Sequence, residues 1–83
     1  MENKIAVLAV IVDDYSSVDK VNSLLHEFRD FVVGRMGIPI PEEKISAISL
    51  IVKGENEKVS ALTGKIGRLK DVNVKSALNN VEI

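Results

Sequence analysis

The sequence has no cysteine and few aromatic residues, and these two deficits narrow the structures it can form. Without cysteine, the 83-residue chain can build neither a disulfide nor a thiolate metal site. Hydrophobic residues make up 46% of the chain but aromatic residues only 4%, so its core must be aliphatic. A domain of this size buries only about 60% of its unfolded surface. We therefore expect a single domain over residues 1–83 that gains stability by self-association.

The sequence also has no excess of positive or negative charge, and it has no long apolar run. Eleven basic and twelve acidic residues give a net charge of -1, which argues against a nucleic-acid surface because phosphate contacts need clustered lysine and arginine. The apolar run over residues 5–12 is much shorter than the about 20 residues of a membrane span. Asp13 and Asp14 follow it, where a leader peptide would have small residues. We expect a cytoplasmic protein with no direct contact to nucleic acid or membrane.

The first half of the chain predicts a strand, a helix and a second strand. Residues 5–12 are apolar at every position and rich in β-branched side chains, which predicts a strand buried on both faces. Ser16 and Asp19 resemble a capping box and predict a helix that ends near Phe28 or Arg29. Asp30 is expected to begin a second strand over residues 31–33, which passes directly into the segment of residues 33–39. The apolar stripe of the helix consists of Val18, Val21, Leu24, Leu25 and Phe28.

The second half repeats this order after a polar connection over residues 40–44. The third strand is expected over residues 45–52, followed by a turn over residues 53–56 and a helix capped by Asn56. Asp71 is expected to open a fourth strand over residues 72–76, and residues 79–83 carry no clear signal. Side chains expected to face the core are Ile48, Leu50 and Val52 on the third strand and Val59, Leu62, Ile66 and Leu69 on the second helix.

Two strand-helix-strand units in so short a chain predict an α+β fold. The matching arrangement is the ferredoxin-like βαββαβ sandwich, which has a four-stranded antiparallel sheet with both helices on one face. The first and third strands would be central, in agreement with their long apolar runs. A fully apolar central strand cannot leave its second face in water, so we expect a second protomer to cover it in a homo-oligomer, a dimer or a tetramer.

The segment over residues 33–39 holds Arg35 between Gly34 and Gly37. One interpretation is that the two glycines give the backbone the freedom to hold a guanidinium around an anion. The other is structural: the strand ends at Met36, the chain turns at Gly37, and Pro39 stops further pairing. The sequence leaves both interpretations open.

A second unusual segment places Gly64 and Gly67 inside the second predicted helix. Each glycine costs about 1 kcal/mol relative to alanine in a helix, so we expect a reason for both. Either they let another backbone pack closely, or a ligand approaches the bare backbone. In the second case Lys65 or Arg68 would supply charge and Thr63 a hydroxyl group.

Three segments together carry a resemblance to a known family: Leu25-His26-Glu27-Phe28, residues 33–39 and residues 62–69. They resemble a family of small bacterial proteins described as regulators of the iron-only hydrogenase system, and the resemblance extends over nearly the whole chain. It implies a ferredoxin-like fold of the ACT-like kind, similar also to the C-terminal domain of the nickel-responsive repressor. ACT-like domains commonly bind effectors where neighbouring subunits meet.

The residues do not favour metal or catalytic chemistry. The repressor analogy would imply several histidine ligands, but His26 is the single histidine, so a square-planar nickel site cannot form within one chain. Asp13 and Asp14 could bind a cation, although a turn before a helix favours aspartate without a ligand. Ser16 and Ser17 are explained as caps. We expect neither an enzyme nor a cofactor, and any transcriptional role would need a partner protein because the chain begins directly with the first strand.

Two hypotheses about function follow. The first is a ligand-sensing regulatory module that binds an anionic small-molecule effector at a subunit interface of a homo-oligomer. The second is a protein-protein interaction module with no small-molecule site, in which the same residues contact a subunit or a partner. The predicted ligand-binding residues are Gly34, Arg35, Gly37, Thr63, Gly64, Lys65 and Arg68, where Lys65 or Arg68 would come from a neighbouring chain.

Overall fold

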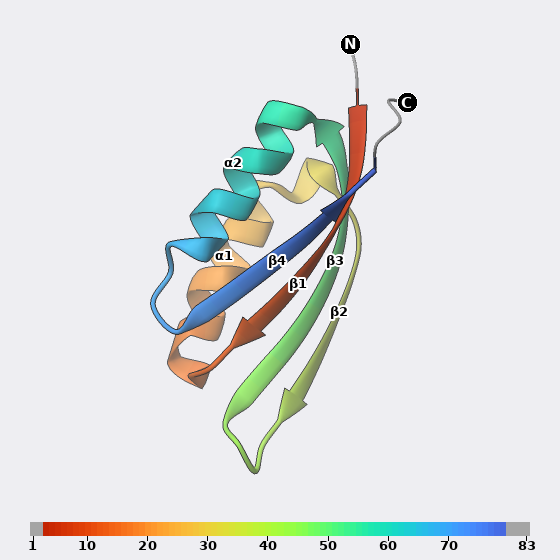
Figure 1. The fold of residues 1–83 in the computed structure, drawn as a ribbon. Coiled ribbons are helices and arrows are strands. Elements are labelled where there is room, and N and C mark those ends of the chain that lie inside the picture. Colours follow the sequence, from red (N-terminus) through yellow and green to blue (C-terminus); the bar gives the residue numbers. More distant parts are fainter. Residues whose placement is uncertain (1–2, 80–83) are drawn as a thin grey trace.

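A computed structural model of the protein describes residues 3–79 and shows one sheet with both helices on one face (Figure 1). No helix within this range is long and apolar enough to cross a membrane. The elements follow in the order β1 (Asn3–Val12), a 3₁₀ turn (Tyr15–Ser17), α1 (Val18–Glu27), a second 3₁₀ turn (Arg29–Phe31), β2 (Val32–Ile40), β3 (Ile45–Glu55), α2 (Asn56–Gly67) and β4 (Val72–Leu78).

The sheet has the strand order β2-β3-β1-β4, and every neighbouring pair is antiparallel. The central strands β1 and β3 pair along their whole shared length, from Asn3 opposite Glu55 to Val12 opposite Ser46. This is the ferredoxin-like βαββαβ arrangement, and it confirms that the two long apolar runs form the central strands.

The core lies between the sheet and the two helices. Alternate residues of β1 such as Leu8 and Val10 are buried, whereas Ile5, Val7 and Ile11 on the other face are about 40% exposed. Within one chain, therefore, β1 is covered on one face only. The predicted helix stripes are confirmed: most of their residues are buried, and Val18, Leu24 and Leu69 are partly buried and pack against the same core. The buried apolar residues are Ala6, Leu8, Val10, Val12, Val21, Leu25, Phe28, Ile48, Leu50, Val52, Val59, Leu62, Ile66 and Val72.

Both predicted helix caps are wrong. Ser16 lies inside the 3₁₀ turn, where its backbone N–H donates to Asp14 Oδ1 at 2.9 Å, and α1 begins only at Val18. The N-cap residue Ser17 instead donates its hydroxyl to the Lys70 carbonyl at 2.9 Å. At α2 the helix starts at Asn56 itself, because β3 runs through the predicted turn to Glu55 and leads directly into the helix.

The fourth strand is longer than predicted. Asp71 takes a left-handed conformation (φ 61°) in the turn before β4, and the strand then continues to Leu78. Asn79, which carried no signal in the sequence, still pairs with Ile5: its side-chain oxygen accepts from the Ile5 N–H at 2.7 Å, and its own N–H donates to the Ile5 carbonyl at 3.1 Å. The remaining residues of that uninformative segment, 80–83, lie outside the described range.

Candidate functional site

The glycine-bracketed segment is part of an edge strand. β2 stays extended to Ile40, which pairs with Ile45 of β3, and neither Gly34 nor Gly37 has a positive φ. The expected turn at Gly37 is therefore wrong, and neither glycine uses the conformational freedom that the anion-binding interpretation invoked. The chain turns after the strand, where Lys44 has a φ of 57°.

A β-bulge in β2 decides which way Arg35 points. Val32 pairs with Val52 but Gly34 pairs with Ile51, so Val33 is an extra residue on the edge strand. The bulge shifts the alternation of the following side chains by one position. Arg35 consequently pairs with the buried Leu50 and lies on the side of the sheet that carries the helices.

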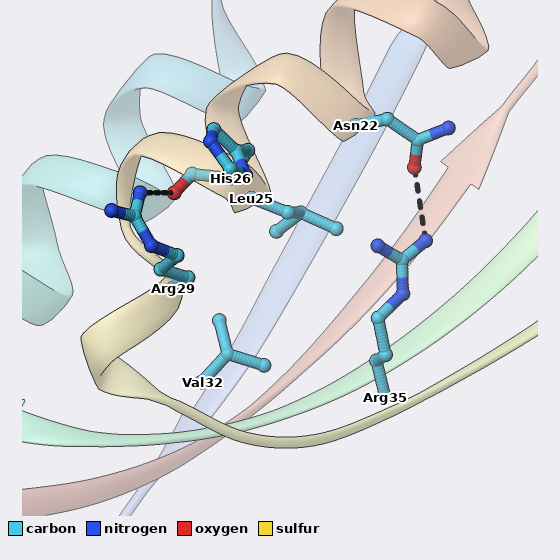
Figure 2. Close-up of a pocket in the computed structure, with 6 residues that line it drawn as sticks. All are labelled: Asn22, Leu25, His26, Arg29, Val32 and Arg35. Atoms are coloured by element: carbon cyan, nitrogen blue, oxygen red, sulfur yellow. Dashed lines mark hydrogen bonds between the residues drawn. The ribbon is translucent and has the colours of Figure 1, made fainter.

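Arg35 borders an open hollow between α1 and β2 (Figure 2). The hollow has a volume of about 400 Å³. Leu25 and Val32 supply its apolar surface, while the Arg29 and Arg35 side chains stand on opposite sides of it. None of the lining residues is acidic; they are Asn22, Leu25, His26, Arg29, Val32 and Arg35.

Each arginine of the hollow is oriented by one hydrogen bond. Arg35 Nη2 donates to Asn22 Oδ1 at 2.9 Å, and Arg29 Nη1 donates to the His26 carbonyl in the last turn of α1 at 2.9 Å (Figure 2). A guanidinium group has five N–H donors, so each arginine keeps donors for a further acceptor. Two oriented guanidinium groups beside an apolar surface form a suitable site for an anion with a small nonpolar part.

The helical side of the hollow comes from one stripe of α1 and the turn after it. Asn22, Leu25, His26 and Arg29 are spaced i, i+3, i+4 and i+7, which places them on the same side of a helix. Of the six lining residues, only Arg35 was among the ligand-binding residues predicted from the sequence; Asn22, His26 and Arg29 were not. Their spacing was a usable signal, but its meaning depends on the edge strand that lies beside this stripe.

The other predicted residues on β2 do not line this hollow. A Cβ atom at Gly34 would have no described atom within 4 Å, and one at Gly37 would make an ordinary contact with Ile48 at 3.9 Å. Neither glycine is therefore required for a close approach within one chain.

The predicted residues on α2 also lie outside the hollow. Thr63 donates its hydroxyl to the Val59 carbonyl of its own helix at 2.9 Å. Lys65 Nζ lies 3.2 Å from Glu27 Oε2 and 5.3 Å from the centre of the Phe28 ring. The assembly of a site from Arg35 and the Thr63, Gly64, Lys65 and Arg68 group of a neighbouring chain stays a prediction.

The two glycines of α2 were expected to let another backbone pack closely, but within the described residues their neighbouring atoms are side-chain atoms. A Cβ atom at Gly64 would meet the Arg68 side chain at 3.4 Å, and one at Gly67 would meet the Val74 side chain at 3.2 Å. Gly67 thus packs against a side chain of β4. For both glycines the neighbouring atoms belong to side chains.

The aspartates after β1 are held by hydrogen bonds within the protein. Asp13 Oδ2 accepts from Asn73 Nδ2 at 3.1 Å. The hydrogen bond from the Ser16 backbone N–H holds the pKa of Asp14 below its ordinary value. Within residues 3–79 the structure contains no group of three or more histidine, cysteine, aspartate or glutamate side chains that could hold a metal ion.

Comparison with known proteins identifies a family. The family model described as "TM1266-like: Iron-only hydrogenase system regulator, putative" matches residues 4–76. The solved structure of the uncharacterized protein TM1266 from Thermotoga maritima is 35% identical in sequence and has a TM-score of 0.87. The match covers 93% of this chain and 98% of that chain. No curated protein matches the chain.

More distant structures share the fold alone. The de novo designed protein Foldit4 has a TM-score of 0.62 at 12% identity, covering 96% of this chain and 99% of that one. CPII from Thiomonas intermedia K12, solved with ADP, AMP and acetate, has a TM-score of 0.55 at 16% identity, covering 100% and 91%. The family match over residues 4–76 is far more specific, and the chain therefore belongs to the TM1266-like family, which is described as "Iron-only hydrogenase system regulator, putative".

Proposed function

We propose that this protein acts as a small regulatory module that binds an anionic effector in the hollow between α1 and β2. The observation that carries the proposal is the pair of arginines, Arg29 and Arg35, on opposite sides of an apolar surface with no acidic lining residue. The whole chain has a net charge of -1, so the cationic character of the hollow is a local feature of its residues.

The arrangement favours an effector that has both a charged and a nonpolar part. An anionic group between the arginines would accept charge-assisted hydrogen bonds, which contribute about 1.5–3 kcal/mol each. Leu25 and Val32 would contact the nonpolar part. Asn22 would keep the Arg35 side chain in place before binding, because its side-chain oxygen already accepts from that guanidinium group.

Binding in the hollow gives a physical route to regulation. An effector that contacts α1, the following 3₁₀ turn and β2 at the same time would join the helix layer to the edge of the sheet. We propose binding and not catalysis, because the lining side chains offer guanidinium, imidazole and amide groups but no hydroxyl, thiol or carboxylate nucleophile.

A thermal-shift screen of small carboxylates and phosphorylated metabolites tests this function. A compound that binds the folded protein alone stabilises it by about 2.7 kcal/mol at 100 times its Kd. In a chain of this size, 1 kcal/mol raises the Tm by about 4–8 °C. We expect Arg35→Ala to abolish the shift and Arg29→Ala to weaken it, while both variants keep the wild-type circular dichroism spectrum.

The matched control is Arg68→Ala, which removes the same charge from the residue that follows α2, outside the hollow. If Arg68→Ala keeps the shift, the site is the hollow of one chain. If Arg68→Ala also abolishes it, the site is the composite one predicted from the sequence. A screen without any stabilising anion, together with recovery of hydrogenase-maturation or transcription proteins in a pull-down, would instead support the ligand-free interaction module.

A further inference from the structure

Both helices lie on one side of the sheet, and within residues 3–79 no helix covers the opposite face (Figure 1). We call this surface the open face; it carries the side chains of β1, β2, β3 and β4 that point away from α1 and α2. Several large apolar side chains on this face are strongly exposed to solvent; the exposed fraction reaches 60% for Met36 and 52% for Ile38. The exposed large apolar residues of the open face are Ile5, Val7, Ile11, Met36, Ile38, Ile40 and Ile51. Apolar patches of this kind mark interaction surfaces.

On the open face, two neighbouring rows of side chains run across the four strands, and each row is raised where the other is low. Directly paired residues share a face of the sheet, so the register defines each row. The first row consists of Met36, Ser49, Ala9 and Lys75, from β2 across to β4. The second row consists of Gly34, Ile51, Val7 and Ala77 in the same strand order. In each strand a large side chain stands in one row and a small one in the other.

The small residues of both rows leave depressions in the surface. One shallow hollow of about 200 Å³ lies over Ala9, Ala47 and Ser49, beside the large side chains of Ile11, Met36 and Ile38. Another, of about 240 Å³, lies beside Gly34 between Met36 and Ile51. A Cβ atom at Gly34 would have no described atom within 4 Å, so the recess at this glycine is open.

We propose that the open face binds the open face of a second copy of this chain, with the two rows facing each other across a two-fold axis. A two-fold axis perpendicular to the strands and between the two rows places the first row of each copy on the second row of the other. Met36 then enters the recess at Gly34 of the other copy, and Val7 and Ile51 enter the depression over Ala9 and Ser49. The relief of the open face is therefore complementary to itself.

The long side chain at the edge of the first row fits the same arrangement. Lys75 of one copy would lie over Ala77 of the other, where its alkyl chain covers apolar surface and its ammonium group reaches water. The two rows contain no acidic residue, and Lys75 is their one lysine or arginine. Lys53 of β3 lies one row further along the open face, opposite Ile5, and its long side chain is exposed, so its ammonium group can reach water beside the contact.

The open face has the size that a stable dimer needs. The sheet has four strands and β1 has ten residues, which at the usual strand dimensions gives about 33 by 19 Å, or about 600 Å² in projection. The relief of the side chains increases the accessible area towards the about 800 Å² per partner of a standard interface.

The β2 edge of the sheet is a poorer place for a second copy. β2 carries a bulge at Val33, and Pro39 has no N–H to donate to a neighbouring strand. Both features oppose the pairing of β2 with another edge. In the face-to-face dimer the helices point outward, so the hollow beside Arg35 remains accessible, and this proposal does not depend on the proposed effector site.

Sedimentation velocity, which measures the dimer Kd, tests the proposal on variants in which the residues at positions 34 and 36 are exchanged. We expect the wild type to dimerise at micromolar concentration. Gly34→Met places a side chain where Met36 of the other copy must enter, and we expect it to raise the dimer Kd by about tenfold or more. The double variant Gly34→Met/Met36→Gly exchanges the knob and the recess, and we expect it to restore the wild-type Kd to within about threefold.

The matched control is Gly37→Met, which adds the same side chain to β2 on the helix side, and we expect it to keep the dimer. Circular dichroism verifies that each variant is folded, and the exchange Ser49→Ile/Ile51→Ser repeats the test on β3 if Gly34→Met does not fold. A wild-type monomer at about 100 μM, well above a micromolar Kd, would overturn the proposal. So would a dimer that Gly34→Met leaves unchanged, or a double variant that stays monomeric.

Discussion

Gly54 is the glycine whose replacement should cost the most stability. It is buried in β3, opposite Lys4 of β1, although the sequence predicted a turn at this position. A Cβ atom at Gly54 would lie 2.7 Å from Cδ1 and 3.3 Å from Cε1 of the Phe31 ring. The ring packs against the core and lies 6.3 Å from the Phe28 ring. Alanine can therefore fit only if the Phe31 ring moves out of its packed position.

The expected free-energy change of Gly54→Ala is the balance of two effects. Overpacking a core position costs about 1–3 kcal/mol. Replacing glycine within a strand recovers about 0.5–1 kcal/mol of backbone entropy. We therefore expect Gly54→Ala to lower the free energy of unfolding by about 1 kcal/mol, with an upper limit near 2.5 kcal/mol. In a domain of this size the Tm would fall by about 4–8 °C for each kcal/mol.

Chemical denaturation of matched glycine variants measures this balance. Gly37→Ala is the control, because its Cβ would make an ordinary contact with Ile48 at 3.9 Å and only the entropic gain remains. We expect it to be neutral or stabilising. In a Phe31→Ala background, Gly54→Ala should lose its cost because the ring is gone. Equal destabilisation by Gly54→Ala in both backgrounds, or a destabilising Gly37→Ala, would refute the steric explanation.

Three further variants test contacts that position the helices. Ser17→Ala removes the hydroxyl that donates to the Lys70 carbonyl at 2.9 Å, and chemical denaturation should show a loss of about 1 kcal/mol. Asp14→Asn should destabilise at neutral pH, because the folded-state pKa of Asp14 lies below 3.8 and its carboxylate stabilises the fold above that pH. The difference from wild type should shrink as the pH falls below 3.8, through the folded-state pKa. Glu27→Gln breaks a half-exposed ion pair with Lys65 and should cost less than about 1 kcal/mol, with a smaller effect in high salt.

The sequence was sufficient to predict the fold because its apolar periodicity is strong. The continuous run that contains Leu8 identified a central strand, and the helical stripe of Val59, Leu62 and Ile66 identified the face of α2 that meets the sheet. Burial of a whole face involves many side chains at once, so no single turn or cap can reverse the pattern.

Local boundaries were harder to predict, because a single hydrogen bond or the junction of two elements decides each of them. Ser16 and Asn56 both have good capping side chains, yet the structure uses neither. Asp14 holds the N–H of Ser16 in a 3₁₀ turn, and β3 enters α2 without a loop that could place Asn56 before the helix. A cap contributes only about 1 kcal/mol, which the geometry of adjoining elements easily overrides.

A single β-bulge connects the two surfaces on which both proposals rest. Strict alternation from the inward-facing Val32 would place Gly34 and Met36 on the helix side and Arg35 on the open face. The extra residue Val33 reverses this pattern, so Arg35 reaches the hollow beside α1, and Met36 and Gly34 form the knob and the recess of the open face. The residues of the segment were visible in the sequence, but their directions were not, because a bulge depends on pairing with a strand that follows later in the chain.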